Sequence, residues 1–445
     1  MPLLRLLLGL MLAGAAQCAL SDTISGSPET YTSLVRKLRA GDVLRLAPGR
    51  YEHGLRLHDL HGAAGNPIVI EGATGNAPTV FIGRPGHNTV SLVNASHIVI
   101  RSLVLDGGGL EVDAVRAERR ETLVHHIGLE NLTIVRHGPE QQTVGISTAA
   151  PAAFWTIRNN VIVGAGTGLY LGNPDGTAPF VAGVIEGNLV ADTTGYNLQI
   201  KHQGPRPALT GMPERPSETL IRGNVFSKAE NSSTGKMARP NVLLGHFPLE
   251  GAGSDDVYRV EANVLYRNPT EALLQAEGNV TIEGNLFLNP DGDGVALLPH
   301  NDVPRRVHVR DNFIESQGTG LQVRGAHPGY TQTAENNLVY GTRSKVGAPG
   351  PDSMRPIDDV PAVLAEWLKN RYASGPDTIS SSLQRAVATA CKSRQLSSHY
   401  ASRNGVLPAS HPACLGLISN SGSAPPSASL GDPAAEVLTC RALAG

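Results

Sequence analysis

The sequence predicts an all-β fold, a right-handed parallel β-helix in which short strands stack as the turns of one solenoid. Glycine (50 residues) and proline (31) are frequent, while aromatic residues make up only 4% of the 445-residue chain, which is typical of turn-rich β proteins. One short phrase, an Asn followed by alternating apolar residues, recurs at intervals from 22 residues (Asn263 to Asn285) to 39 (Asn224 to Asn263). Such a period indicates stacked repeats, because one repeat cannot bury its apolar face alone.

The recurring Asn marks one position in successive turns. Its instances are Asn131, Asn160, Asn188, Asn224, Asn263, Asn285, Asn312 and Asn337. Stacked turns lie about 4.8 Å apart, the spacing of paired strands. We therefore expect each Asn at a bend, where its amide bonds to the neighbours above and below.

The amino terminus predicts export. Residues 1–19 contain Arg5, an apolar stretch and the small residues Gly14 and Ala16, the pattern of a secretory signal peptide. No later segment has 18 apolar residues in a row, so we expect no transmembrane segment and a secreted or periplasmic protein. The net charge of 37 − 39 = −2 gives no electrostatic reason to expect nucleic acid as a partner. We expect a monomer.

The segment before the repeats carries a further pattern. It comprises Gly41, Asp42, Pro48, Gly49, Tyr51, Gly65, Asn66, Pro67 and Ile68. These residues resemble the opening of secreted β-helix polysaccharide lyases of the chondroitinase-B and alginate-lyase type. The resemblance covers roughly residues 22–110, and the repeat pattern continues to about 342.

The resemblance implies a short helix at about 29–39, with Leu34, Val35 and Leu38 capping the core. In such lyases a Lys acts as base and an Arg steadies the substrate carboxylate, with calcium in some members. Lys201 stands at a position suited to that base, while the rest of the catalytic motif has no residue-by-residue match here. No cofactor is assigned, and a divalent cation such as calcium is the candidate. The acidic loops 254–256 and 291–293 could hold it, or they are ordinary turns.

A second phrase follows six of these Asn residues, in segments 168–173, 197–202, 241–246, 272–277, 295–300 and 320–325. It ends 13 to 15 residues after its Asn, except after Asn224, where the insertion 227–240 lengthens the distance to 22. In this alignment the last column contains Asn173, His202, His246, Glu277, His300 and Gly325. The column before it contains Lys201 and Arg324, and outward positions further back hold Tyr170, Gln199 and Gln322. At about 4.8 Å per turn the file from His202 to His300 spans roughly 14 Å, the length of a few sugar units.

Three interpretations of this file remain open. Its imidazoles titrate near neutral pH and suit proton transfer, with Lys201 beside them. His202, His246 and Glu277 also form a two-His, one-carboxylate set for a metal, provided that their side chains converge. Alternatively, the file is a structural stack of polar residues at a turn.

Two insertions flank the file and carry basic residues, Arg206 after His202 and Arg239 at the end of 227–240. Loops on one flank of a β-helix wall a groove, and Arg binds carboxylates with two hydrogen bonds. The sequence thus predicts an acidic polysaccharide as partner.

We expect a lyase that cleaves a uronate-containing polysaccharide by β-elimination. Lys201 or His246 is the candidate base, His300 or Tyr170 the candidate acid, and Arg206, Arg239 and Arg324 the carboxylate binders. One alternative is a non-catalytic polysaccharide- or surface-binding protein. Another is a glycoside hydrolase on the same scaffold, which needs two facing carboxylates where the file offers one.

The predicted domain order is a β-helix over 22–342, a linker over 343–356 and a helical, partly disordered tail over 357–445. Residues 358–372 and 381–395 have helical patterns. We expect the tail to cover the last turn of the solenoid.

Overall fold

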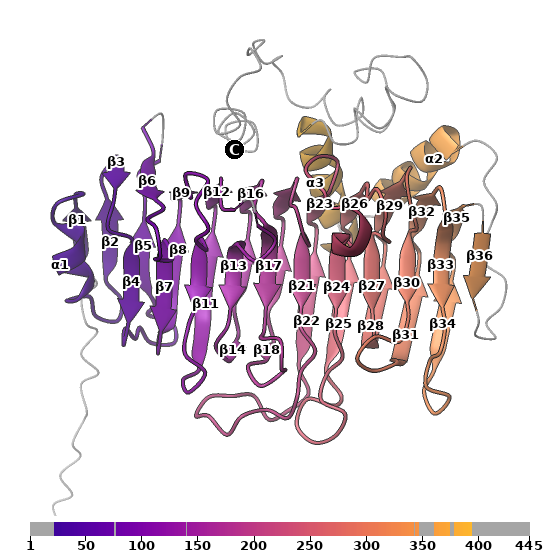
Figure 1. Cartoon of the computed structure of the whole chain (residues 1–445), viewed down its shortest axis with the longest axis horizontal. Helices are drawn as coiled ribbons and strands as arrows, with labels where there is room; N and C mark the ends of the chain where they lie inside the picture. The colour runs from indigo at the N-terminus through magenta and orange to yellow at the C-terminus, as the bar shows by residue number, and fades with distance from the viewer. Residues whose placement is uncertain are drawn as a thin grey trace, which may run out of the picture.

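The computed structural model describes residues 22–74, 77–138, 140–341, 343–346, 360–373 and 378–393. Within these residues the strands form three sheets of 14, 11 and 11 strands, in which every pair of named strands is parallel. A typical turn contributes one strand to each sheet, while β14 and β18 are additional short strands of the first sheet, and the turns stack along the long axis of the molecule (Figure 1). The predicted parallel β-helix is confirmed. The predicted signal peptide, residues 1–19, lies outside the described residues.

The sheets are named in the order in which the chain visits them. The first sheet comprises β1 (Thr23–Gly26), β2 (Val43–Leu46), β5 (Ile68–Glu71), β8 (Ser96–Arg101), β11 (Val124–Glu130), β14 (Ala152–Ala153), β15 (Thr156–Arg158), β18 (Phe180–Val181), β19 (Val184–Glu186), β22 (Glu218–Arg222), β25 (Val257–Glu261), β28 (Gly278–Glu283), β31 (Pro304–Arg310) and β34 (Gln332–Glu335). The second comprises β3 (Gly49–Tyr51), β6 (Thr79–Ile82), β9 (Val104–Asp106), β12 (Thr133–Val135), β16 (Val161–Val163), β20 (Leu189–Ala191), β23 (Val225–Ser227), β26 (Val264–Tyr266), β29 (Leu286–Asn289), β32 (Phe313–Ser316) and β35 (Leu338–Tyr340). The third comprises β4 (Leu55–His58), β7 (Val90–Val93), β10 (Val115–Ala117), β13 (Val144–Thr148), β17 (Thr167–Leu171), β21 (Leu198–Ile200), β24 (Val242–Leu244), β27 (Leu274–Ala276), β30 (Val295–Leu297), β33 (Thr319–Val323) and β36 (Arg343–Val346).

The interior of the solenoid consists of apolar files in register. Ile68, Ile98 and Ile127 lie opposite one another on β5, β8 and β11, and each is at most 1% exposed. Alternate residues of a strand point to opposite faces, so one side chain fills the core while the next faces outward. The outward positions are therefore free to carry charge and polar groups.

The predicted Asn ladder is present from Asn160 to Asn337. The side-chain amide of Asn224 donates to Oδ1 of Asn263 (2.9 Å) and to the carbonyl of Ile185 (2.9 Å). The same Oδ1 of Asn263 accepts the backbone N–H of Asn224 at 2.9 Å. Each bend thus has its buried polar groups satisfied by the next turn.

Asn131 does not belong to this ladder, contrary to prediction. Thr133 lies opposite Val161, which places Leu132 at the ladder position, and the backbone N–H of Leu132 donates to Oδ1 of Asn160 (2.8 Å). Asn131 is exposed and has a φ of 52°. The sequence alignment of this turn is therefore wrong by one residue. Asn131 precedes the ladder position because Asn also favours the left-handed conformation of this bend.

An alternating file of Arg and Glu runs along the outer face of the first sheet. Glu71 lies between Arg45 and Arg101 in register, and its carboxylate receives both guanidinium groups at 2.7 and 2.6 Å. The file continues strand by strand through Glu130, Arg158, Glu186, Arg222, Glu261, Glu283 and Arg310, and the alternation breaks once, where Glu261 lies opposite Glu283. Exposed pairs add about 0–1 kcal/mol each. Their larger effect is on the register of the strands, because a strand that slipped out of register would place like charges opposite each other.

A short helix covers the N-terminal end of the stack, as expected. It is α1 (Tyr31–Val35), shorter than the predicted 29–39. Val35 and Leu38 join the core, Leu34 packs against it half-buried, and the ring of Tyr31 packs edge-on against that of Tyr51 at 5.1 Å. These side chains close the first turn against water.

The C-terminal segment differs from prediction in two ways. The expected linker begins with β36, which pairs with β33, so the third sheet gains a strand beyond 342, while 347–356 lie outside the described residues. The two expected helices are α2 (Val360–Ala373) and α3 (Thr378–Lys392). They pack laterally on the second sheet, where Leu364, Trp367 and Leu383 join outward residues of its strands, rather than over the last turn (Figure 1). None of the described helices has the length and apolar character of a membrane span.

We expect Asn263→Ala to lower the free energy of unfolding by about 3 kcal/mol or more, since each buried polar group left unpaired costs about 1–3 kcal/mol. The substitution removes the acceptor for both N–H groups of Asn224 and the donor to Ile221. Urea unfolding followed by circular dichroism measures the change. Asn131→Gly is the matched control, because glycine adopts the same φ freely, and it should change stability by less than about 0.5 kcal/mol. Equal stability of the two variants would contradict a stabilising ladder.

Candidate active site

A groove of about 320 Å³ lies on the outer face of the third sheet, across β10, β13, β17 and β21. Its floor is one row of outward residues in register: Arg116, Ser147, Tyr170 and Gln199. Four cationic side chains line it, from Arg116, Arg120, Lys201 and Arg239. Tyr196 and the amides of Gln141, Gln142 and Asn173 complete its polar walls. Among the described residues that line it there is no carboxylate.

Lys201 follows β21 directly and enters the groove half-buried. Its Nζ lies 5.9 Å from the centroid of the Tyr170 ring. Burial lowers the pKa of Lys201, and the attraction of the more distant Glu277 opposes this shift only in part. Within the described chain no carboxylate comes close enough to form an ion pair with it. Lys201 is thus a lysine that loses its proton more readily than an exposed one.

Tyr170 and Arg239 border the same space. Burial raises the pKa of Tyr170, so its hydroxyl keeps its proton at neutral pH. The guanidinium of Arg239 lies 6.0 Å from the ring centroid of Tyr196, and it donates to the carbonyls of Lys236 (3.1 Å) and Ala238 (2.7 Å). These contacts hold the guanidinium at the groove, where it can meet an anionic ligand.

The loop that carries Arg239 is anchored by a second lysine. Lys228 is 1% exposed, and its Nζ donates to the carbonyl oxygen of Arg239 at 2.7 Å. Burial lowers the pKa of Lys228 to about 7, despite the attraction of Glu271. This lysine therefore positions the backbone of the groove wall and does not face the ligand.

Arg116 and Arg120 were not foreseen from the sequence. Arg116 pairs with Asp113 at 2.7 Å, and Arg120 with Asp175 at 2.7 Å. Arg116 occupies the same outward row as Tyr170 and Gln199, so extending the repeat alignment to β10 would have found it. The predicted phrase began only at residue 168, one strand after β13.

The predicted His file is only half formed. His202 and His246 stack with ring centroids 5.4 Å apart and 24° between the planes. Leu244 lies opposite Ala276, and Ala276 opposite Leu297. Glu277 therefore falls one position before His246, and His300 one position after it. The prediction of one file was wrong because the apolar pattern of 272–277 fits two registers one residue apart.

Glu277 is a backbone anchor and not an exposed acid. It is 1% exposed, and its Oε2 accepts the N–H groups of His300 (3.2 Å), Asn301 (2.7 Å) and Asp302 (2.8 Å). Its Oε1 accepts the backbone N–H of His246 at 3.2 Å. The predicted roles of Glu277 in proton transfer or in a metal set with His202 and His246 are therefore not supported by this geometry, which instead ties down the loop after β30.

Arg206 is not a substrate binder, contrary to prediction. Its side chain is only 3% exposed and pairs with Asp256, which is 2% exposed, while it also donates to the carbonyl of Pro213. A buried guanidinium held in this way cannot reach a polymer in the groove. Arg206 instead fastens the insertion after His202 to the loop before β25.

The acidic loops expected to bind calcium are occupied by the protein itself. Asp255 pairs with Arg306 and Asp291 with Arg267, both at 2.6 Å. Oδ1 of Asp293 accepts the backbone N–H of Thr319 at 2.7 Å. Calcium requires several free oxygen ligands, and the groove offers no lining carboxylate either, so these residues do not fit that ion.

Gln322 and Arg324 share the outward face with the groove but lie beyond it. Gln322 is in register with Ala296, Gln275, Leu243 and Gln199 in turn, so it belongs to the predicted row. Four strand spacings separate it from Gln199, about 19 Å. Neither residue therefore contributes to the groove around Lys201.

Comparisons with known structures agree with the fold. An alginate lyase from Paenibacillus sp. str. FPU-7 is similar at 16% identity and a TM-score of 0.47, over 74% of this chain and 96% of that one. The A-module of the mannuronan C-5 epimerase AlgE4 from Azotobacter vinelandii is similar at 14% identity and a TM-score of 0.46, over 74% and 93%. A GH136 lacto-N-biosidase from Eubacterium ramulus is similar at 12% identity and a TM-score of 0.40, over 73% and 67%.

An alginate lyase is thus among the solved structures similar to this chain, in line with the predicted resemblance to parallel β-helix proteins that act on polysaccharides. No protein-family model and no curated protein matches the chain. At these identities and TM-scores the likeness concerns the fold alone. The function is therefore argued from the groove.

Arg206→Ala should destabilise the protein by about 3–5 kcal/mol, because it leaves the carboxylate of Asp256 buried without its partner. Arg306→Ala is the matched control, since Arg306 pairs with the neighbouring Asp255 in an exposed position, where a pair is worth about 0–1 kcal/mol. Urea unfolding of both variants measures the difference. A fully stable Arg206→Ala protein that binds polysaccharide less tightly would restore Arg206 as a ligand-binding residue.

Proposed function

We propose that this protein is a lyase that cleaves an acidic, uronate-containing polysaccharide in the groove of the third sheet. The observation that carries the proposal is Lys201, half-buried and without a carboxylate partner in a groove lined by cations. A cationic site without lining carboxylates favours a polyanion. The signal peptide predicted at residues 1–19 would deliver the protein to the compartment where such polymers occur.

The first step needs a base at the carbon next to the uronate carboxylate. The Nζ of Lys201, as the free amine, takes the proton from C5, and the electron pair of the C–H bond passes into the carboxylate group as an enolate. The lowered pKa of Lys201 increases the fraction of free amine at a given pH. Base catalysis of this kind contributes about 10²–10⁴-fold to a rate.

The enolate carries more negative charge than the ground-state carboxylate, so cations aimed at it favour the transition state. Arg239 and Lys201 line the same groove, and Arg116 lies on its floor, three strands away from β21. Arg116 pairs with Asp113 and Arg120 with Asp175, which leaves Arg239 as the lining guanidinium that forms no ion pair within the described residues. We assign the carboxylate of the substrate to Arg239.

The second step breaks the bond between C4 and the glycosidic oxygen. The enolate electrons form the C4=C5 double bond, and the leaving oxygen takes a proton from an acid. Tyr170 borders Lys201, and burial keeps its hydroxyl protonated. The products are a new reducing end and an unsaturated uronate, which absorbs ultraviolet light.

Glycoside hydrolysis is less well supported. It requires two carboxylic groups that face each other across the scissile bond. The described lining of the groove contains none, and Glu277 is engaged by backbone N–H groups. A non-catalytic binding role uses the same cations and is separated from the lyase by an assay for turnover.

The test is an ultraviolet scan for unsaturated uronate after the mature protein is incubated with alginate, pectate, chondroitin or heparan. We expect absorbance to rise with at least one polymer, and Lys201→Ala to lower the initial rate by about 10²–10⁴-fold. Lys37→Ala, an exposed lysine at the N-terminal end, is the control and should keep the rate. Flat traces with every polymer, together with retained binding, would replace the lyase by a binding protein.

The pH dependence of kcat/KM provides a separate test of the two roles. The rate should rise with pH as Lys201 loses its proton, and this limb should lie below the ordinary range of lysine because burial lowers the pKa. It should fall again as Tyr170 loses its proton, above the ordinary range of tyrosine because burial raises that pKa. Tyr170→Phe should slow the reaction and abolish the falling limb. If the rising limb of the profile instead lies in the pKa range of histidine and disappears in His246→Ala, the base is His246.

A further inference from the structure

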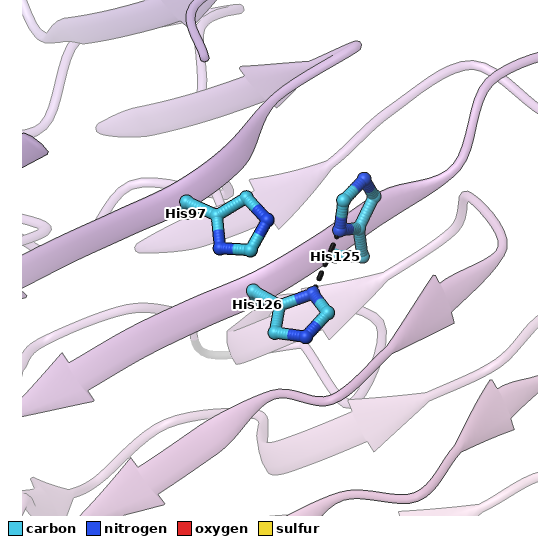
Figure 2. Close-up of side chains that lie close together, drawn as sticks. All are labelled: His97, His125 and His126. Carbon is cyan, nitrogen blue, oxygen red and sulfur yellow. Dashed lines mark hydrogen bonds between the residues drawn. The ribbon is translucent and has the colours of Figure 1, made fainter. Parts of the chain in front are cut away.

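Three histidines from two neighbouring turns converge where the chain enters the first sheet. His97 lies on β8, and His125 and His126 lie on β11. His125 is opposite Ser96, so His126 is beside His97 in the stack. One nitrogen of each ring lies within 4.8 Å of the others, and Figure 2 shows the three rings grouped on one side of the strands.

Ring stacking accounts for two of the three. The rings of His97 and His126 are parallel, with centroids 4.3 Å apart and 21° between planes, and Phe154 continues the stack at 4.6 Å. All three residues occupy the left-handed region, at φ values of 54°, 53° and 58°. This repeated bend turns their side chains into one file.

His125 does not fit that explanation. Its ring stands nearly perpendicular to those of His97 and His126, at 87° and 80°. Its Nδ1 lies 2.8 Å from Nδ1 of His126, as the dashed line in Figure 2 shows. In such a pair only one nitrogen donates, so the other presents a lone pair.

The cluster has the chemistry of a transition-metal site. Burial and the neighbouring His126, His97 and His61 lower the pKa of His125 to about 4, and burial also lowers that of His126. Neutral imidazoles are the form that binds metals. The described cluster contains no carboxylate, which disfavours calcium and magnesium, whereas imidazole nitrogens suit zinc, copper and nickel.

We propose that His97, His125 and His126 bind one zinc ion and thereby join two turns of the solenoid. Zinc–nitrogen bonds of about 2.0–2.1 Å put the ligand nitrogens of a tetrahedron about 3.3 Å apart. The distance of 2.8 Å between Nδ1 of His125 and Nδ1 of His126 must increase by about half an ångström to reach this value. The ligand nitrogen of His97 lies within 4.8 Å of the other two and must move closer to them. Because His126 is exposed, the fourth position faces solvent.

Titration calorimetry of the mature chain, expressed without a polyhistidine tag, tests the proposal with zinc chloride. We expect one ion per chain, and X-ray absorption at the zinc edge should show three imidazole nitrogens. His125→Ala should weaken binding by about 100-fold or more, because even changes outside the ligand shell cost about 10–100-fold. His125→Gln keeps the bulk of the side chain and serves if the alanine variant does not fold.

Two control variants fix the location of the ion. His308→Ala removes a histidine of β31 on the same sheet, whose Nδ1 bonds to Thr333 Oγ1, and should leave the affinity unchanged. His202→Ala/His246→Ala removes the stacked pair and should also retain the ion. Absence of zinc binding, or binding that survives His125→Ala and His125→Gln but not the double variant, overturns the proposal. Because the measurement does not involve the lyase assay, its outcome is independent of the proposed function.

Discussion

The structure depends on one interaction, the hydrogen bond that each buried Asn makes to the Asn of the next turn. A turn of a β-helix must bury bent backbone, whose N–H and C=O groups are costly to leave unpaired. The ladder from Asn160 to Asn337 pairs those groups and fixes the position of each bend along this part of the stack relative to the one before. The strands on either side then meet in register, so outward residues form straight rows. The groove is one consequence, since Tyr170 and Gln199 share a row only because their turns stack without slipping.

The same register distributes the charged side chains differently over the first and the third sheet. On the first sheet, carboxylates such as Glu71 and Glu130 lie between arginines, and Arg45, Arg101 and Arg158 form ion pairs with them. On the third sheet the groove collects cations from neighbouring turns with no lining carboxylate among the described residues. A chain with a net charge of only −2 thus carries a locally positive groove. Stacked repeats reach this result through a few residues per turn, without any excess of basic residues in the composition.

The repeated features could be predicted from the sequence, and the features that depend on one contact could not. The Asn phrase identified the solenoid, and the second phrase brought Lys201, Tyr170 and Gln199 to one face. The position of Glu277 was wrong by one residue because its strand is apolar enough to fit either register. Arg206 looked like a free cation because its partner Asp256 lies 50 residues later, in a loop without a pattern. The histidine cluster was missed because its members follow the stack in space while lying 28 residues apart in the chain, from His97 to His125.

The Asn ladder also determines how such a protein can change in length during evolution. An insertion within a strand or bend would break the row of amides, whereas a loop between sheets can grow freely, as the segment between Ser227 and Asn241 shows beside turns of ordinary length. The chain can also gain or lose a whole turn, because an added turn brings its own Asn and joins the existing row of amides. The walls of the groove can therefore change through the length of the loops, and the length of the solenoid can change through duplication of turns. Neither change alters the cross-section of the core.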